Sequence, residues 1–214
     1  MRKAIQQSIS EPCNKRGVAR QQKFLETAEK LFLASGYANT SVNEVVRLSG
    51  GSLGTLYRLF GNKIGLFEAV FRKLAMTFFN ELEEGVVWSD DVERSLMAFG
   101  RHIQSVVLKP DGIAIYRLVL MENNDDQKEI QRIYYKYGPQ VGIEMLACYL
   151  RKQVSLKKIA PINEEIAATQ FIEMVKGPFV NRLLFGEEVS EEDVELALIQ
   201  GVKIFINGLA IKPD

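Results

Sequence analysis

Apolar residues recur at steps of three and four along most of this chain, and glycine-rich or polar stretches divide the pattern into separate helices. The spacing predicts helices over residues 20–35, 41–49, 52–60, 63–84, 91–108, 113–123, 127–156, 163–185 and 190–209. We expect a turn at 109–112 and a bend at Gly138-Pro139, because proline removes a helical hydrogen bond. The run 112–121 has the length of a buried strand, but no other segment offers a partner strand. The pattern therefore predicts an all-α fold.

Residues 40–63 contain two short helical patterns around a glycine turn. Ser41 and Glu44 have the spacing of a capping box, which satisfies free N–H groups at a helix start. Gly50-Gly51 ends the first helix, because glycine adopts the backbone angles of a tight turn. Ser52 is placed to cap the second helix, whose apolar residues fall on one side. This arrangement is typical of a helix-turn-helix, whose second helix enters the major groove of DNA.

Three segments, 28–41, 54–60 and 62–67, resemble the N-terminal DNA-binding domain of the TetR family of bacterial transcriptional regulators. The resemblance implies an N-terminal three-helix domain with a helix-turn-helix, followed by a C-terminal helical domain for ligand binding and dimerisation. It divides the chain into an arm over 1–18, a DNA-binding domain over 19–63 with its motif at about 40–59, and a regulatory body over 64–214. The helix over 63–84 starts where the DNA-binding domain ends, so we expect it to act as a lever between the two.

The resemblance also implies which residues meet DNA. Thr40, Tyr57 and Lys63 correspond to residues that hold phosphates in the family. We expect Leu53, Thr55 and Arg58 to approach base edges. The whole predicted set comprises Thr40, Ser41, Arg47, Ser52, Leu53, Gly54, Thr55, Tyr57, Arg58 and Lys63.

Two residues of the motif depart from the usual pattern of the family. Gly51 stands where a branched apolar residue is common, and we expect it to loosen the packing of the turn. Leu53 stands where a lysine or another polar residue is common, which favours apolar contact with a thymine methyl group. These departures bear on the operator sequence and not on the fold.

Charge is distributed unevenly along a chain whose net charge is zero. Residues 1–63 hold ten Lys/Arg and four Asp/Glu, a net charge of +6, and residues 64–214 carry −6. A basic N-terminal part joined to an acidic body is typical of a DNA-binding protein with a separate regulatory domain. The basic arm over 1–18 is either disordered or an additional contact to phosphates or the minor groove.

The last predicted helix is apolar on more than one side, so it needs a second partner. We expect the last two helices of two subunits to form a four-helix bundle, as in TetR-like homodimers. The predicted interface comprises Val194, Ala197, Leu198, Gly201, Val202 and Phe205. Leu196, Ile199 and Ile206 widen the apolar face.

The C-terminal domain of TetR-like regulators usually encloses a small, often apolar or aromatic molecule whose binding releases DNA. Residues 117–120 and 137–139 resemble the AefR-like branch of the family. The predicted pocket residues, each equally well explained as ordinary core, are Trp88, Phe99, His102, Tyr116, Met121, Phe171 and Met174. The resemblance implies a ligand-released repressor that binds double-stranded, palindromic operator DNA. One alternative is a DNA-binding protein without a small effector. The other is a helical interaction protein that has lost DNA binding, which the departures at Gly51 and Leu53 leave open.

Motifs for catalysis, metal binding and cofactor binding are missing from the sequence. His102 is the single histidine, and the two cysteines are too far apart for a zinc site. We therefore predict that the protein is not an enzyme and uses no metal or cofactor. The first 20 residues hold no apolar run typical of a signal peptide, and no stretch reaches the roughly 18 apolar residues of a membrane span. This absence predicts a cytoplasmic protein.

Overall fold

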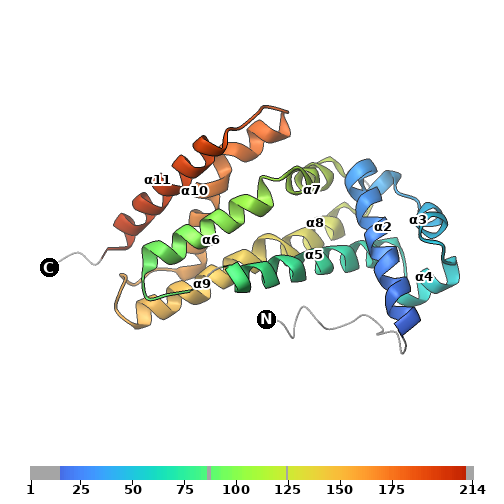
Figure 1. Ribbon diagram of the computed structural model, residues 1–214, viewed down its shortest axis with the longest axis horizontal. Helices are drawn as coiled ribbons and strands as arrows, with labels where there is room; N and C mark the ends of the chain where they lie inside the picture. Colours follow the sequence, from blue (N-terminus) through green and yellow to red (C-terminus); the bar gives the residue numbers. More distant parts are fainter. Residues whose placement is uncertain (1–14, 86–87, 124, 211–214) are drawn as a thin grey trace. The chain divides into compact units, whose positions relative to one another are not determined.

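The computed structural model describes residues 15–85, 88–123 and 125–210, and every regular element in these ranges is a helix (Figure 1). The all-α prediction is confirmed. The helices are α2 (Lys15–Asn39), α3 (Val42–Ser49), α4 (Leu53–Phe60), α5 (Lys63–Gly85), α6 (Val92–Val107), α7 (Pro110–Met121), α8 (Gln127–Tyr137), α9 (Pro139–Ser155), α10 (Glu164–Leu184) and α11 (Glu191–Leu209). The predicted arm lies outside the described residues except for 15–18, which begin α2.

The chain forms two compact units, which we describe separately. The first unit contains the described residues of 1–77 and 114–138, and the second contains those of 78–113 and 139–214. Both α5 and α7 contribute residues to each unit. The predicted DNA-binding helices therefore share a compact unit with most of α7 and with α8. The domain boundary after residue 63 stays a prediction.

In the first unit, α2 packs against α3 and α4. Its buried Phe24 meets Phe60 of α4 edge to face, with ring centroids 6.3 Å apart. Phe32 of α2 meets Phe67 of α5 in the same way at 5.2 Å. Buried aromatic pairs of this geometry stabilise a core beyond the apolar area that they bury. The aromatic residues thus fix α4 and the start of α5 on one supporting helix.

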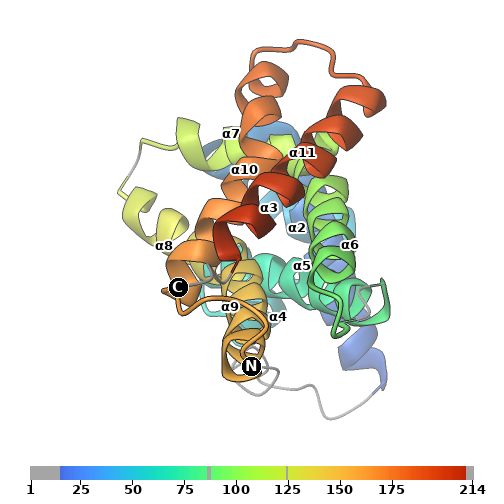
Figure 2. The same ribbon diagram turned by 90° about the vertical axis from the view of Figure 1, so that its left-hand side faces the viewer.

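In the second unit, α6, α9, α10 and α11 surround a common apolar core. Phe99 of α6, Phe171 of α10 and Leu198 of α11 are fully buried there. Figures 1 and 2 both show α10 and α11 lying side by side. A Cβ at Gly100 would lie 2.5 Å from Leu198, so this glycine allows α6 and α11 to approach closely.

Two prolines change predicted helix boundaries, and a third lies inside a helix. Pro110 begins α7 and is not part of a turn before it, because the first position of a helix needs no N–H donor. Pro139 separates α8 from α9, so the predicted bend is a complete break at Gly138. Pro178 stays inside α10, which continues to Leu184.

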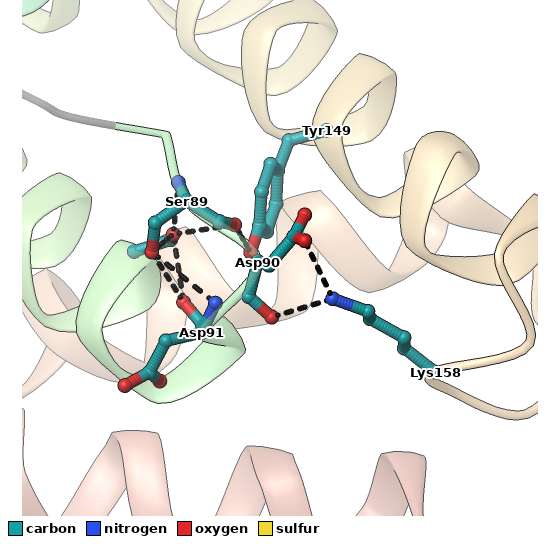
Figure 3. A network of polar contacts seen from close by, with 6 residues as sticks. Ser89, Asp90, Asp91, Tyr149 and Lys158 are labelled. Atoms are coloured by element: carbon teal, nitrogen blue, oxygen red, sulfur yellow. Dashed lines mark hydrogen bonds and ion pairs between the residues drawn. The ribbon is translucent and has the colours of Figure 1, made fainter.

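A polar network holds the start of α6 in the second unit (Figure 3). The Tyr149 hydroxyl of α9 donates to the carbonyl of Ser89 at 2.9 Å. Lys158 donates to the carbonyl of Asp90 at 3.1 Å and lies 3.3 Å from its carboxylate. Asp91 caps α6 by accepting from the N–H of Arg94 at 3.0 Å. The segment before α6 is therefore fixed at both its backbone and its side chains.

Candidate nucleic-acid interface

The residues on either side of the short helix α4 determine where it begins and ends. The Ser52 hydroxyl accepts a hydrogen bond from the N–H of Thr55 at 3.2 Å, which confirms the predicted cap. Gly61 ends the helix with φ 77°, and its N–H donates to Tyr57. Leu56 and Phe60 are buried, so they attach one side of α4 to the unit. The opposite side remains exposed.

The turn before α4 depends on two glycines with different roles. Gly50 has φ 70° and ψ 38°, the left-handed conformation of a helix C-cap. Gly51 provides space, because a Cβ there would lie only 2.3 Å from Cζ of Phe24. The expectation that Gly51 loosens the turn is therefore wrong, since the Phe24 ring occupies the place of the missing side chain. The Arg20 guanidinium also binds the turn by donating to the carbonyls of Ser49, at 2.9 Å, and Gly50.

The exposed side of α4 carries apolar, aromatic and basic side chains, and its first turn includes a glycine. Leu53 is 37% exposed and Tyr57 46% exposed. Arg58 is also exposed. A Cβ added at Gly54 would meet no atom within 4 Å, so this part of the backbone faces open space. The Thr55 hydroxyl lies 3.0 Å from that of Ser52, and the pair stays close to the helix start.

The residues predicted on α3 and just before it divide into exposed and buried ones. Ser41 is exposed and begins α3, but its side chain makes no capping hydrogen bond, so the predicted capping box is wrong. Glu44 instead faces the exposed Arg47 at 3.5 Å. Thr40 is 4% exposed, and its hydroxyl donates to the carbonyl of Gly36 at 2.7 Å. Thr40 thus closes the corner between α2 and α3, and its predicted phosphate contact stays a prediction.

Lys63 is half-buried at the start of α5 and already has partners. Its Nζ donates to the carbonyl of Ala38 at 3.1 Å and lies 4.3 Å from the centre of the Tyr37 ring. Burial lowers the pKa of the Lys63 ammonium, and the negative charges of Glu122 and Asp126 act against this shift. The sequence pattern did not predict these four neighbours of Lys63, because they come from three separate segments that share no motif.

The predicted pocket residues do not come together. Phe99 and Phe171 are fully buried in the core of the second unit, and Trp88 stacks on Tyr149 with ring centroids 4.6 Å apart. His102 lies against Phe78, and Met174 packs against Gly201. Tyr116 and Met121 belong to the first unit, where Met121 is 73% exposed. Most of these side chains pack in the core of their own unit, and their role in a ligand pocket stays a prediction.

A groove of about 400 Å³ lies between α6, α10 and α11 in the second unit. None of the seven predicted pocket residues lines it. Its lining joins apolar side chains such as Leu108, Leu183 and Val194 with the cations Arg101 and Lys109. Arg101 pairs with Glu195 at 2.5 Å. The groove is therefore amphipathic.

Four of the six predicted dimer residues face the core of their own chain. Leu198, Val202 and Phe205 are buried among residues of α6, α9 and α10, and Gly201 lies against Met174 and Val175. Val194 and Ala197 are half-buried. The inner stripe of α11 is thus a contact within the subunit, and its assignment to a partner is corrected. The exposed apolar residues of α11 are Leu196, Ile199 and Ile204.

We expect His102 to make the stability of the second unit dependent on pH. Burial lowers its pKa from 6.5, outweighing the opposite effect of Glu81, while Lys109 adds to the lowering. The unfolded chain therefore binds a proton at a higher pH than the folded chain does. We expect the stability contributed by neutral His102 to be complete above about pH 6.5 and lost as the pH falls through the lower folded-state pKa.

The measurement is urea unfolding at pH 7.5, 6.5 and 5.5, with His102→Phe as the control. Because the chain has a single histidine, the variant removes the imidazole titration and keeps a ring against Phe78. As the pH falls, the unfolding free energy of wild type should decrease relative to that of the variant. A pH-independent difference would contradict the shift.

No group of three or more His, Cys, Asp or Glu residues in the described parts of the chain is placed to hold a metal ion. Among the helices of residues 15–210, leaving out 86–87 and 124, none has the length and apolar character to cross a lipid bilayer.

Two protein families match this chain. The family "Bacterial regulatory proteins, tetR family" matches residues 24–70. The C-terminal domain of AefR-like transcriptional repressors matches residues 94–208, which is more than half of the chain. YvkB of Bacillus subtilis, an uncharacterized HTH-type transcriptional regulator, is 24% identical over 202 residues, covering 88% of this chain and 96% of that protein.

Solved structures show the same fold. A Mesorhizobium loti protein, described as a TetR-family transcriptional regulator, aligns with a TM-score of 0.80 at 21% identity. The alignment covers 92% of this chain and all of that one. The flavonoid-responsive regulator FrrA aligns with a TM-score of 0.75 at 23% identity, covering 91% of this chain and 98% of FrrA.

Proposed function

Since this chain belongs to the TetR family of bacterial transcriptional regulators, we propose that it is a homodimeric repressor that places α4 in the major groove of a palindromic operator. The observation that supports this most strongly is the exposed side of α4, with an unobstructed Gly54 between Leu53 and Thr55. A helix backbone without a side chain can approach base edges closely. Ser41, Arg47, Tyr57, Arg58 and Lys63 surround this surface as phosphate or base contacts.

The experiment is a footprint of the purified protein on the DNA that flanks its own coding region. A two-fold symmetric dimer should protect two half-sites whose centres are about 34–36 Å apart, or a multiple of that distance. Protection that weakens as salt rises would support phosphate contacts. Equal, unlocalised binding to unrelated DNA would favour the alternative of an interaction protein that no longer recognises an operator.

Leu53 gives the proposed interface a preference for thymine. It lies at the first position of α4, is 37% exposed, and has Gly54 beside it. An apolar side chain makes no hydrogen bond to a base, but it can bury the C5-methyl group of thymine in the major groove. We therefore propose that each half-site carries a thymine opposite Leu53.

Replacing single thymines of the operator by uracil tests this contact, because uracil lacks only the methyl group. At one position in each half-site we expect about a three- to tenfold loss of affinity, corresponding to the burial of roughly one methyl group. Leu53→Ala should lose the distinction between thymine and uracil at that position alone. If every thymine can be replaced without loss, Leu53 does not contact a methyl group.

The proposed dimer uses the outer apolar face of α10 and α11. Leu196 is 60% exposed, Ile204 54% and Ile166 56%, so more than half of the surface of each residue is open to solvent. α10 and α11 lie side by side, so two copies can form a four-helix bundle. The outer face thus replaces the inner stripe as the proposed interface.

We expect Leu196→Glu combined with Ile204→Glu to give a monomer at micromolar concentration, because the interface would then bury unpaired carboxylates. Light scattering after size-exclusion chromatography measures the mass. Lys152→Glu, at an exposed position on α9, serves as the control and should leave the mass unchanged. A double variant that stays dimeric and folded would rule out this face.

A small effector is the remaining part of the proposal. FrrA is described as flavonoid-responsive, and the groove lined by Leu108, Lys109 and Val194 has a volume in the range of small-molecule sites. Aromatic carboxylates and flavonoids form a suitable first panel, with release from the operator as the readout. A protein that stays bound with every compound would favour the alternative of a regulator without a small effector.

A further inference from the structure

Two carboxylates of the first unit hold the corner between α2 and α3. Glu122 directly follows α7 and is 6% exposed, and its Oε1 accepts a hydrogen bond from the N–H of Ala38 at 2.9 Å. Asp126, which precedes α8, accepts from the Tyr37 hydroxyl at 2.7 Å. The two side chains thus bind consecutive residues of the corner.

Lys63 completes this cluster from the start of α5. It donates to the carbonyl of Ala38, the residue whose N–H is bound by Glu122. Its Nζ also lies over the Tyr37 ring, whose hydroxyl is bound by Asp126. Both carboxylates act electrostatically on the ammonium. Lys63 is therefore surrounded by a carbonyl oxygen, an aromatic face and two negative charges.

A DNA phosphate must compete with these groups. Lys63 is one of the proposed phosphate contacts, and an ammonium shared with nearby carboxylates is a weaker partner for a further anion. We propose that Glu122 and Asp126 are positioning residues for DNA binding, which hold Lys63 on the α2–α3 corner and so reduce the strength of its phosphate contact.

This inference rests on the proposed function, and it gives α7 a role in that function. α7 begins with residues of the second unit and ends one residue before Glu122. A movement of α7 that displaced Glu122 would therefore change the partners of Lys63. The hold on Lys63 offers a physical means by which the C-terminal part of the chain changes DNA affinity.

Glu122→Gln and Asp126→Asn test the proposal, because each keeps an oxygen acceptor and removes the charge. Each variant should bind the operator about three- to fivefold more tightly in low salt, the effect of one partly exposed charge pair. The dependence of affinity on salt should become steeper, because Lys63 contributes more fully to the phosphate contacts. Unchanged or weaker binding by both folded variants would overturn the proposal.

Two controls separate an effect on Lys63 from a general change in charge. Glu129→Gln removes an exposed carboxylate of α8 that pairs with Arg132, and it should change affinity by less than twofold. In a Lys63→Ala background, Glu122→Gln and Asp126→Asn should have no larger effect than Glu129→Gln. A full gain of affinity without Lys63 would contradict the mechanism. Thermal unfolding shows whether the buried Glu122→Gln variant is folded, and Asp126→Asn provides the test if it is not.

Acylation of lysines without DNA distinguishes this inference from the proposed function. The rate at Lys63, measured by mass spectrometry relative to the exposed Lys30, should rise in Glu122→Gln and Asp126→Asn. If the chain bound no operator but Lys63 became more reactive, the proposed function would fail and the hold on Lys63 would stand. An unchanged relative rate would overturn the hold whatever the DNA result.

Discussion

Gly51→Val is expected to destabilise the first unit by about 1–3 kcal/mol, the usual cost of overpacking a closed site. The new Cβ would lie 2.3 Å from Cζ of Phe24. Phe24 is fully buried and its ring meets Phe60 edge to face, so it cannot swing away freely. Either the ring or the turn must move. Because the turn sets the direction of α4, operator affinity should fall with stability.

Chemical unfolding of wild type, Gly51→Val and the double variant Phe24→Leu/Gly51→Val measures this effect. Leucine has no atom at the position of Cζ, so the double variant should be more stable than the sum of the two single changes predicts. Strict additivity, or a Gly51→Val protein as stable as wild type, would show that the turn has room for a side chain. The branched residue that the family commonly has at this position would then fit here as well.

Local patterns predicted most of the helix starts correctly. Ser52, Asn163 and Ser190 each accept a hydrogen bond from an N–H three residues later, as a capping residue does. These contacts depend on neighbours in sequence, so the spacing of polar and apolar residues is enough to find them. Ser41 has the same pattern without the hydrogen bond. A favourable spacing thus permits a cap but does not ensure it.

For a helix with apolar residues on two faces, the sequence did not show which face packs against the core. α11 carries apolar residues on both faces, and only packing shows that Leu198 and Val202 face α6 and α10 while Leu196 and Ile204 face outward. Contacts between distant segments were equally inaccessible. Ala38 and Glu122 are 84 positions apart, and neither belongs to a recognisable motif. The corner that they form depends on the tertiary fold.

The packing of Phe24 against Gly51 weakens the alternative that this chain has lost DNA binding. That alternative rested on two departures, Gly51 and Leu53. Phe24 compensates for the first within the supporting helix α2. The second leaves an exposed apolar side chain on α4, which suits a thymine methyl group. Both departures are therefore compatible with a working helix-turn-helix.

Gly54→Leu is expected to abolish operator recognition without harming the fold. A Cβ added at Gly54 would have no neighbouring atom within 4 Å, so the site is open to solvent. Leucine is a better helix former than glycine by up to about 1 kcal/mol, so the variant should be at least as stable as wild type. In the proposed complex, however, the new side chain would lie between the α4 backbone and the base edges. The leucine would hold α4 away from the groove, and all of its base contacts would be lost at once.

Comparison of wild type and Gly54→Leu in an operator titration, with thermal unfolding of both proteins, tests the central claim most directly. We expect an unchanged or raised melting temperature and a loss of specific affinity of at least about a hundredfold, since several base contacts of roughly 1–3 kcal/mol each are broken. Gly54→Ala should lie between the two. If Gly54→Leu bound the operator as tightly as wild type, this side of α4 would not face DNA, and the proposed interface would be wrong.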